Sequence, residues 1–480
     1  MKPRNYPVDP PQLWDHFYDI TQIPRPSGAE AALREHIIRL AVAGGHDWRS
    51  DEAGNLLVSV AARGGLQDAE PVIIQNHLDM VTVKAADRDF DFDTDPLDLV
   101  VEGGWLRADR TTLGADNGVG CAAALALMTD PDVKHPPLEL LFTVDEESGL
   151  HGALALDRGL LRGSRMLNLD TEEWLELYVG CAGGAGWEFR RAFATGAAAR
   201  DAQGWQISLS GLAGGHSGIQ IHEQLGNAIK LLAQCLVGVP GLQLAAADVG
   251  VAHNVIPREG SVTFACAPGA GQSLADGLAR FREQVLAWLP PADHALQLEL
   301  VAADVDEVLG EEDSAVVLDL LAAMPHGALA YDRESPEELV ELSINLALLR
   351  LTKGELFLES SYRFFNPDQS LHLQQSVLAT ARAFDLQVMD TVGYPGWEPR
   401  FDGELLALAR ELQLELFGVA PAVKAIHAGL ECGIVKSKKP ELDILSFGPT
   451  IRGAHSPAER LKIDTVAPFW RFLTELLARM

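Results

Sequence analysis

Short apolar segments typical of β-strands alternate with helix-forming segments over the first 184 residues of this 480-residue chain. The spacing of the apolar residues predicts helices over 30–43 and 118–128, and strands over 72–76 and 138–144. Alternation of this kind favours a layered domain in which helices pack on a sheet. The sequence therefore predicts the α/β class for this part of the chain.

Two turn-rich segments divide the chain. The glycine-rich segment 180–186 follows the first α/β set, and the segment 393–397 precedes a return of the α/β pattern near the C-terminus. Between them two successive sets of helices and strands follow each other in a similar order, and the first set includes a predicted helix from about Leu225 to Val237. We therefore expect one α/β domain formed by residues 1–184 and 394–480, interrupted by an inserted α+β lid domain of two similar subdomains at residues 185–393.

The composition narrows the classes of partner. The chain has 38 Lys and Arg against 68 Asp and Glu, and its formal net charge of −30 repels phosphate backbones and anionic lipids. No segment is apolar enough to span a bilayer, and the first residues lack the apolar core of a secretory signal. The five scattered cysteines indicate neither a disulfide framework nor a CxxC metal site. We therefore expect a cytoplasmic protein that binds neither nucleic acid nor membranes.

Acidic and imidazole side chains recur where predicted strands end, which is where open α/β sheets form their binding sites. Such a mixed set suits zinc, manganese or cobalt and lacks the thiolates of a structural zinc site. Each residue alone would more often be structural, so only the combination predicts a metal centre. The segments are HLDMV (77–81), GADNG (114–118), DEES (145–148), NLDTE (168–172) and GAHSPAE (453–459), and the candidate ligands are His77, Asp116, Glu147, Asp170 and His455.

The order of these motifs resembles the M20 metallopeptidase family, which has an H-x-D strand end, an isolated Asp, a Glu-Glu pair, a further Asp and a C-terminal His. The resemblance spans nearly the whole chain. The strings NHLDMVTVK, LGADNGVG, TVDEESGLHGA, GLAGGHSGIQIH, HAGLECG and FGPTIRGAHSPAER are further similar to the aminoacyl-histidine dipeptidase branch of the family. The resemblance implies an M20-type catalytic domain built from both chain ends. It also implies hydrolysis of dipeptides with free termini, including Xaa-His dipeptides.

The resemblance further implies how the candidate ligands divide between two divalent metal ions, for which zinc is favoured over manganese or cobalt. Asp116 would bridge the two ions. His77 and Asp170 would complete one site, and Glu147 and His455 would complete the other. Two ions that share a ligand can activate a water and polarise a scissile carbonyl.

Two further carboxylates are expected to support this chemistry. Asp79 follows His77 by two residues on the same strand, so its carboxylate can accept the other N–H of the ligand imidazole. Glu146 is the expected general base, since the resemblance commits Glu147 to metal. Asp145 is adjacent and also acidic, and the family pattern favours Glu146 over it.

The inserted domain carries the other candidate site residues. His216, in GGHSG, resembles the family histidine that stabilises the oxyanion. Asn254 resembles the family's substrate-contacting amide, and Arg363 is a natural partner for the substrate α-carboxylate because a guanidinium can bind it through two hydrogen bonds. Gly429 in HAGLECG would allow close approach of the backbone to substrate.

Other activities have less support in the sequence. It contains no G-x-S-x-G elbow, no H-E-x-x-H motif and no phosphate-binding loop. Fold and metal ligands do not fix a substrate, so an aminoacylase, carboxypeptidase or tripeptidase is the alternative reading. A non-catalytic protein that binds metal or peptide is a further one. We expect small peptides as substrates, and the sequence is compatible with a homodimer.

Overall fold

The computed structural model describes residues 2–332 and 339–480, and the chain forms two compact units. The first unit comprises Met1–Cys181, Trp397–Ala425 and Leu430–Met480. The second comprises Ala182–Gly396 and the short segment Ile426–Gly429. The return of residues 426–429 to the second unit has no counterpart in the sequence pattern.

An eight-stranded sheet forms the centre of the first unit, in the order β1-β2-β6-β3-β7-β23-β8-β22. β3 pairs in parallel with β6 and β7, and β7 pairs in parallel with β23, so the carboxyl ends of these four strands meet at one edge. Every residue of β3 and β6 is buried, as expected for strands covered on both faces. The strands are β1 (Asp47–Ser50), β2 (Leu56–Val60), β3 (Val72–His77), β6 (Leu138–Thr143), β7 (Arg165–Asn168), β8 (Glu176–Cys181), β22 (Ala422–Ile426) and β23 (Asp443–Ser446).

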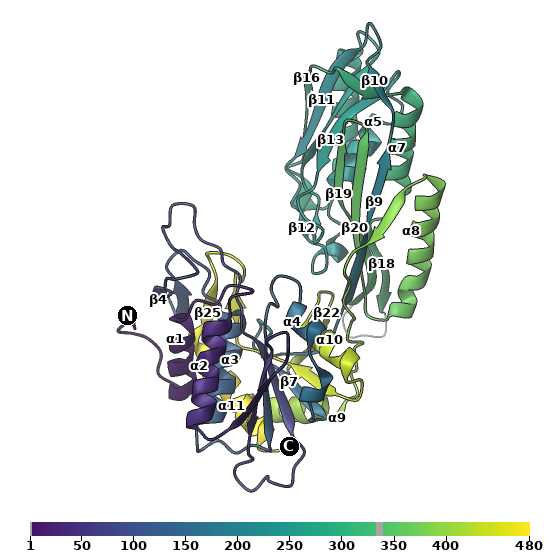
Figure 1. The fold of residues 1–480 in the computed structure, drawn as a ribbon. Coiled ribbons are helices and arrows are strands. Elements are labelled where there is room, and N and C mark those ends of the chain that lie inside the picture. The colour runs from purple at the N-terminus through teal and green to yellow at the C-terminus, as the bar shows by residue number, and fades with distance from the viewer. Residues whose placement is uncertain (1, 333–338) are drawn as a thin grey trace. The chain divides into compact units, whose positions relative to one another are not determined.

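Helices cover both faces of this sheet, and Figure 1 shows α1, α2 and α3 on one side and α4 and α10 on the other. The most buried helix is α3, whose alanine-rich sequence packs closely against β3. The helices are α1 (Pro11–Thr21), α2 (Ala31–Ala43), α3 (Ala115–Thr129), α4 (His151–Ala155), α9 (Glu404–Phe417), α10 (Glu431–Lys438) and α11 (Ile463–Leu477). A separate four-stranded sheet has the order β24 (Ile451–Arg452), β25 (Arg460–Lys462), β5 (Trp105–Ala108) and β4 (Leu99–Glu102).

The second unit is built on a nine-stranded antiparallel sheet whose main order is β16-β11-β15-β13-β19-β20-β9-β21, with β18 beside β19. Figure 1 shows α7 and α8 along the same face of this sheet. The strands are β9 (Gly183–Ala192), β11 (Gln203–Ser210), β13 (Gln243–Val249), β15 (Gly260–Cys266), β16 (Gln297–Ala302), β18 (Gly327–Asp332), β19 (Leu339–Thr352), β20 (Glu355–Phe364) and β21 (Gln387–Asp390). The helices are α5 (Ala228–Leu236), α6 (Gly271–Leu286), α7 (Glu311–Ala323) and α8 (Leu371–Ala383). Two short ribbons pair β10 (Thr195–Ala197) with β17 (Glu307–Leu309) and β12 (Gly215–His216) with β14 (Val255–Ile256).

The two halves of this sheet have the same topology. In the first half the chain runs β11-α5-β13-β15-α6-β16, and the strands lie in the order fourth, first, third, second. In the second half β9, α7, β19, β20, α8 and β21 give the same succession and the same order, read from the opposite edge. This is the β-α-β-β-α-β arrangement. In the sequence, the whole first half is inserted between β9 and α7 of the second half.

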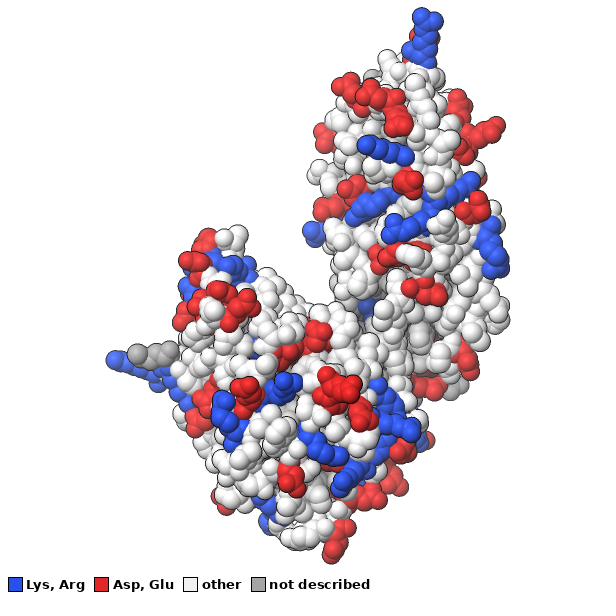
Figure 2. Space-filling model, in the orientation of Figure 1, with Lys and Arg blue, Asp and Glu red and all other residues white. Residues whose placement is uncertain are grey.

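The surface agrees with the strongly acidic composition. Figure 2 shows Asp and Glu side chains over both units on the face in view, interspersed with Lys and Arg. Among the residues that the structure describes, no helix combines the length and the apolar character that crossing a lipid bilayer requires.

Candidate metal centre and active site

The first unit brings its acidic and imidazole candidates together at the carboxyl edge of the central sheet. His77 ends β3, the segment after β6 carries Glu146 and Glu147, and Asp170 lies two residues beyond β7. Asp116 lies in the first turn of α3, where its backbone departs from helical geometry. His455 follows β24 and has a positive φ of 62°. Strand ends, loops and the first turn of α3 thus position the set.

The carboxylate of Asp116 lies between two histidines. Its Oδ1 is 3.0 Å from Nε2 of His77, and its Oδ2 is 3.3 Å from Nε2 of His455. His77 Nε2 is also 3.4 Å from Asp170 Oδ1, and His455 Nε2 is 3.0 Å from Glu147 Oε2. Asp116 is therefore shared by two three-residue groups, each with its ligand atoms within 4.8 Å of one another.

The charges of these groups fit a cation centre. Burial would lower the pKa of His77, but the carboxylates of Asp170, Asp116 and Asp79 together raise it well above its ordinary value. Hydrogen bonds to Asp116 and Glu147 raise the pKa of His455 to about 11. Both imidazoles are thus drawn toward the cationic form by an excess of carboxylate. A donor set of two imidazoles and several carboxylates is one that divalent transition metals prefer.

Asp79 is completely buried and connects His77 with the glutamate pair. Its Oδ1 lies 3.3 Å from Nδ1 of His77 and accepts a 3.0 Å hydrogen bond from the backbone N–H of Glu146. Its Oδ2 accepts hydrogen bonds from the backbone N–H of Glu147 at 3.0 Å and from Ser27 Oγ at 2.7 Å. The same carboxylate therefore orients the imidazole and fixes the backbone of both glutamates.

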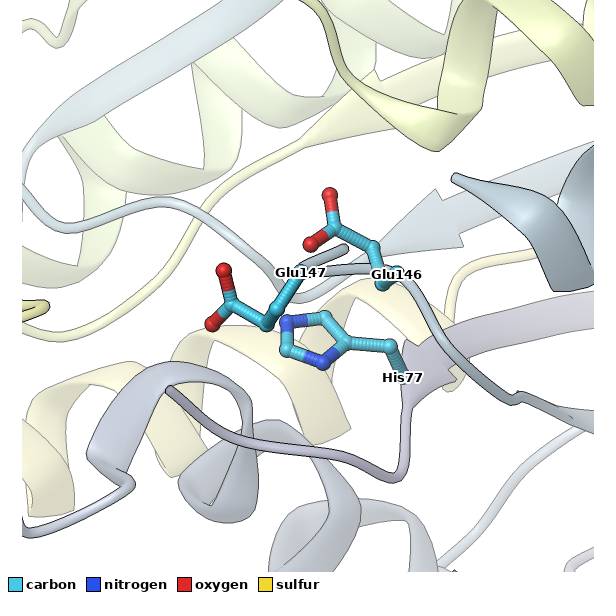
Figure 3. Close-up of side chains that lie close together, drawn as sticks. All are labelled: His77, Glu146 and Glu147. Atoms are coloured by element: carbon cyan, nitrogen blue, oxygen red, sulfur yellow. The ribbon is translucent and has the colours of Figure 1, made fainter. Parts of the chain in front are cut away.

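Glu146 and Glu147 present their carboxylates close to the imidazole of His77, which comes from the end of β3 (Figure 3). Burial, and then the charges of Asp170 and Glu147, raise the pKa of Glu146 well above its ordinary value despite the opposing effect of His77. Oε1 of Glu147 is buried and has no hydrogen-bond partner among the described residues. An unpartnered buried carboxylate oxygen at this position is suited to a ligand role.

Asp145 has a different environment from its two neighbours. Its carboxylate contacts Nδ1 of His151 at 2.7 Å, and its backbone N–H donates to Glu30 Oε1 at 2.9 Å. Asp145, Glu30 and Asp79 form a further acidic group, but hydrogen bonds within the protein already use Glu30 and Asp79. The structure therefore separates Asp145 from the group that contains Glu146.

Two buried charged residues that were not among the predicted site residues hold the loops that carry the candidate ligands. Oε2 of Glu459 accepts hydrogen bonds from the backbone N–H groups of Leu113 and Gly114, at 2.7 and 2.9 Å, and its Oε1 accepts from Ala115 at 2.7 Å and Asp116 at 3.4 Å. Arg25 donates to the carbonyl oxygens of Leu78 and Asp79. Glu459 lies within the GAHSPAE string, whereas no sequence signal distinguished Arg25.

The second unit contains His216 on the short strand β12 and Asn254 in the turn directly before β14. His216 in β12 pairs with Val255 in β14, and the carbonyl of Asn254 accepts a 2.9 Å hydrogen bond from the N–H of Ser217. Asn345 donates from Nδ2 to the carbonyls of His253 and Val255, at 3.1 and 2.9 Å. The β12–β14 ribbon and the turn that leads into it thus hold the two candidates close together in the chain fold.

Arg363 and Gly429 also belong to the second unit. Arg363 lies in β20 and is only 8% exposed. A Cβ atom on Gly429 would lie 2.7 Å from the ring of Tyr394, so the glycine leaves room for that ring. Tyr394 is a residue that the sequence motifs did not single out.

Comparisons with known proteins identify the family. The model of peptidase family M20/M25/M40 matches residues 73–479. The cytosol non-specific dipeptidase of Escherichia coli strain K12 is 36% identical over 487 residues, which is 98% of each chain.

Solved structures show the same relationship. The aminoacylhistidine dipeptidase of Vibrio alginolyticus has a TM-score of 0.87 at 36% identity, with 98% of this chain and 97% of that chain covered. A tripeptidase from Staphylococcus aureus has a TM-score of 0.55 at 16% identity, with 98% of each chain covered, and shares the fold. The family match and the similarity over nearly the full length agree with the motif order in the sequence. This chain belongs to peptidase family M20/M25/M40.

Proposed function

We propose that this chain is a metal-dependent dipeptidase that hydrolyses dipeptides with free amino and carboxyl termini, including Xaa-His dipeptides. The observation that carries the proposal is the position of Asp116, whose two carboxylate oxygens each face one histidine-containing group. The dipeptidases from E. coli and V. alginolyticus, similar over nearly the full length, support this substrate class.

Two divalent metal ions, with zinc favoured by the ligand set, would supply Lewis acidity for the scissile carbonyl and for the attacking water. Asp116 would bridge them. His77 and Asp170 would hold one ion, and Glu147 and His455 the other. The two groups offer only imidazole nitrogens and carboxylate oxygens, which excludes a thiolate-bound structural site.

Glu146 acts as the general base. Its carboxylate takes a proton from the attacking water and delivers it to the leaving amine nitrogen. Two features support this role: its neighbour Glu147 belongs to the ligand group around Asp116, and the backbone of Glu146 is fixed by Asp79. A base that is held by its backbone keeps its orientation during proton transfer.

His216 stabilises the negative charge that develops on the carbonyl oxygen. Its Nδ1 accepts hydrogen bonds from the backbone N–H groups of Gly218 and Ile219, at 3.2 Å each. A neutral imidazole that accepts at Nδ1 carries its proton on Nε2, so the ring offers an Nε2–H donor. Such a donor, fixed in advance by the turn, is what an oxyanion requires. Asn254, which directly precedes β14, contributes its side-chain amide to the substrate.

Arg363 binds the free carboxylate of the substrate, while the amino end lies near the metal-site carboxylates. Recognition of both termini limits the length of the substrate, because a tripeptide would leave one charged end without its partner. We also assign the chain to the cytoplasm, in line with its similarity to a cytosolic enzyme and with five cysteines that form no disulfide in the described residues.

The test compares hydrolysis of Ala-His, N-acetyl-Ala-His and Ala-Ala-His by purified, metal-reconstituted protein, with a chelator-treated sample as control. Selective, metal-dependent cleavage of Ala-His is the expected result. Preferred cleavage of the acetylated peptide would move the assignment to an aminoacylase or carboxypeptidase, and preferred cleavage of Ala-Ala-His to a tripeptidase. Absence of cleavage would favour a non-catalytic role.

A further inference from the structure

Tyr394 occupies a slot formed by two glycines of the second unit. Its backbone N–H donates to the carbonyl of Gly184 at 2.8 Å, and its carbonyl accepts from the N–H of Gly184 at 3.0 Å. A Cβ on Gly184 would lie 2.7 Å from the phenol oxygen of Tyr394, and one on Gly429 would lie 2.7 Å from Cε2. Neither glycine has a positive φ, so the backbone conformation does not require glycine at these positions. Glycine is required because a Cβ would collide with the Tyr394 side chain. The phenol ring is therefore held in one place.

The phenol oxygen is the hydrogen-bond partner of a buried guanidinium. Arg363 Nη1 donates to Tyr394 Oη at 2.8 Å, which is the one hydrogen bond of the Arg363 side chain within the described residues. The other side of this guanidinium faces a turn, because a Cβ on Gly218 would lie 3.0 Å from Nε. Arg363 is thus confined between Tyr394 and the turn that follows His216.

Among residues 2–332 and 339–480, the guanidinium also has no counter-ion. Over residues 2–332 and 339–480, no carboxylate oxygen lies within 4.0 Å of Arg363, and its Nε is buried without a partner. A buried charge without a partner is costly, since desolvation removes its interactions with water. An anionic ligand would offset that cost.

His427 lies beside Arg363 and adds no positive charge. Burial, and then the nearby Arg363 guanidinium, lower the pKa of His427 to about 3, so its ring is neutral at working pH. Its Nε2 contacts Ser343 Oγ at 2.8 Å, and its ring packs against Phe365 with centroids 5.7 Å apart. Within the part of the chain that the structure describes, Arg363 is therefore the group beside His427 that offers a permanent positive charge to a carboxylate.

From this arrangement we infer that Tyr394 is a specificity-determining residue, which positions the Arg363 guanidinium to select a substrate that ends in a free carboxylate. The inference rests on the proposed function and deepens it. A guanidinium binds a carboxylate through two parallel hydrogen bonds only when its plane is correctly oriented. Tyr394 holds one edge of that plane and leaves the remaining donors for the ligand. A carboxamide in the same position accepts fewer hydrogen bonds and carries no charge.

The test uses full-length, metal-loaded protein and two substrates, Ala-His and its C-terminal amide. Tyr394→Phe removes the phenol oxygen and keeps the ring in its slot. We expect KM for Ala-His to rise about tenfold, kcat to change by less than about threefold, and the preference for carboxylate over amide to fall about tenfold. Tyr331→Phe is the matched control, because it removes a phenol oxygen from the same unit at a residue without an assigned role, and it should leave both constants unchanged.

Three outcomes would overturn the inference. An active Tyr394→Phe variant with unchanged carboxylate preference would show that Arg363 needs no positioning by the phenol. A loss of kcat at unchanged KM would place the phenol at the reacting carbonyl. Wild-type protein that cleaves no dipeptide in a metal-dependent manner would instead overturn the proposed function, and the inference with it.

Discussion

Glu459 and Arg25 bind the two polar groups of the same residue, Gly114, on the segment that leads to Asp116. The N–H of Gly114 donates to Glu459 Oε2 at 2.9 Å, and its carbonyl accepts a hydrogen bond from Arg25 Nη2. Both side chains are at most 2% exposed. A side chain on Gly114 would collide with Arg25 and with Met80, and its φ of 64° is one that favours glycine. The position of Asp116 is therefore set by two buried charges that are distant from it in sequence.

Replacement of Glu459 by Gln is expected to destabilise the first unit. A carboxamide has one acceptor oxygen where the carboxylate has two, so at least one buried N–H group of residues 113–115 would lose its partner. We expect the free energy of unfolding to fall by about 3 kcal/mol. Urea denaturation measures it, and Glu475→Gln on the exposed side of α11 is the control. Equal stability of the two variants would contradict this account of Glu459.

Replacement of Asp79 by Asn is expected to weaken metal binding. The amide cannot accept hydrogen bonds from the backbone of both Glu146 and Glu147 while it also faces His77. Loss of such an orienting carboxylate lowers metal affinity by about 10- to 100-fold. Competition with a chromophoric chelator gives the affinity. Ser27→Ala, which removes only one hydrogen bond to Asp79, should have a smaller effect, and the reverse order would argue against the orienting role.

Substitutions of the neighbouring residues Glu146 and Glu147 are expected to have different effects on turnover and metal content. Glu146→Gln should retain its metal content but lose turnover by about 10²- to 10⁴-fold, because the amide cannot accept the proton of the attacking water. Glu147→Gln should lose metal as well, since Glu147 belongs to the group around Asp116 and His455. Elemental analysis of the purified variants gives their metal content, and kcat gives their turnover. Together the two measurements distinguish the effect of Glu146→Gln from that of Glu147→Gln. Near-normal turnover of metal-loaded Glu146→Gln would contradict its assignment as the base.

The second unit should lose stability in mild acid because of His326. Burial, and then the charge of Lys230, lower the pKa of His326 from 6.5 to about 4. The folded state thus binds fewer protons than the unfolded state between these values. The contribution of His326 is fully present above pH 6.5 and is lost as the pH falls toward 4.

We expect this residue to contribute a slope of about 1 kcal/mol per pH unit below pH 6. His326→Asn should flatten the pH dependence by that amount while the side chain still offers an acceptor to Asn227, whose Nδ2 lies 3.2 Å from His326 Nδ1. His372→Asn, at an exposed position of α8, provides the comparison. Unfolding curves at several pH values measure the slopes, and parallel slopes for wild type and His326→Asn would refute the prediction.

The sequence predicted helices and strands correctly where the pattern of apolar residues extends over the whole element. The strand predicted over 72–76 corresponds to β3 (Val72–His77). His77, Glu147 and Asp170 lie at or after the ends of such strands, whereas Asp116 lies in the first turn of α3. The helix predicted from about residue 225 begins only at Ala228, because Asn227 caps it by accepting hydrogen bonds from the N–H groups of Ile229 and Lys230. Leu225, whose apolar side chain suggested an earlier start, packs in a separate cluster with Ile221 and Ile256.

The residues that sequence reasoning missed act over long distances in the chain. Glu459 binds an N–H group 346 residues before it, and Tyr394 binds the side chain of Arg363, which lies 31 residues away. Neither pairing has a local periodicity or a spacing that could be recognised in one sequence. By contrast, Asp79 follows His77 by two residues just beyond the end of β3, and this spacing alone predicts that they meet. Local geometry was therefore predictable, and contacts between distant segments were not.

The nested topology of the second unit affects its synthesis on the ribosome. β9 pairs with β20 and β21, both of which lie C-terminal to it. Translation must complete the whole first half of the sheet, from β11 to β16, before either strand that pairs with β9 has been synthesised. Until then the nascent chain presents a ten-residue strand with unpaired edges, a form that invites association with other chains. Protection of β9 during translation is thus a requirement that this arrangement places on the cell.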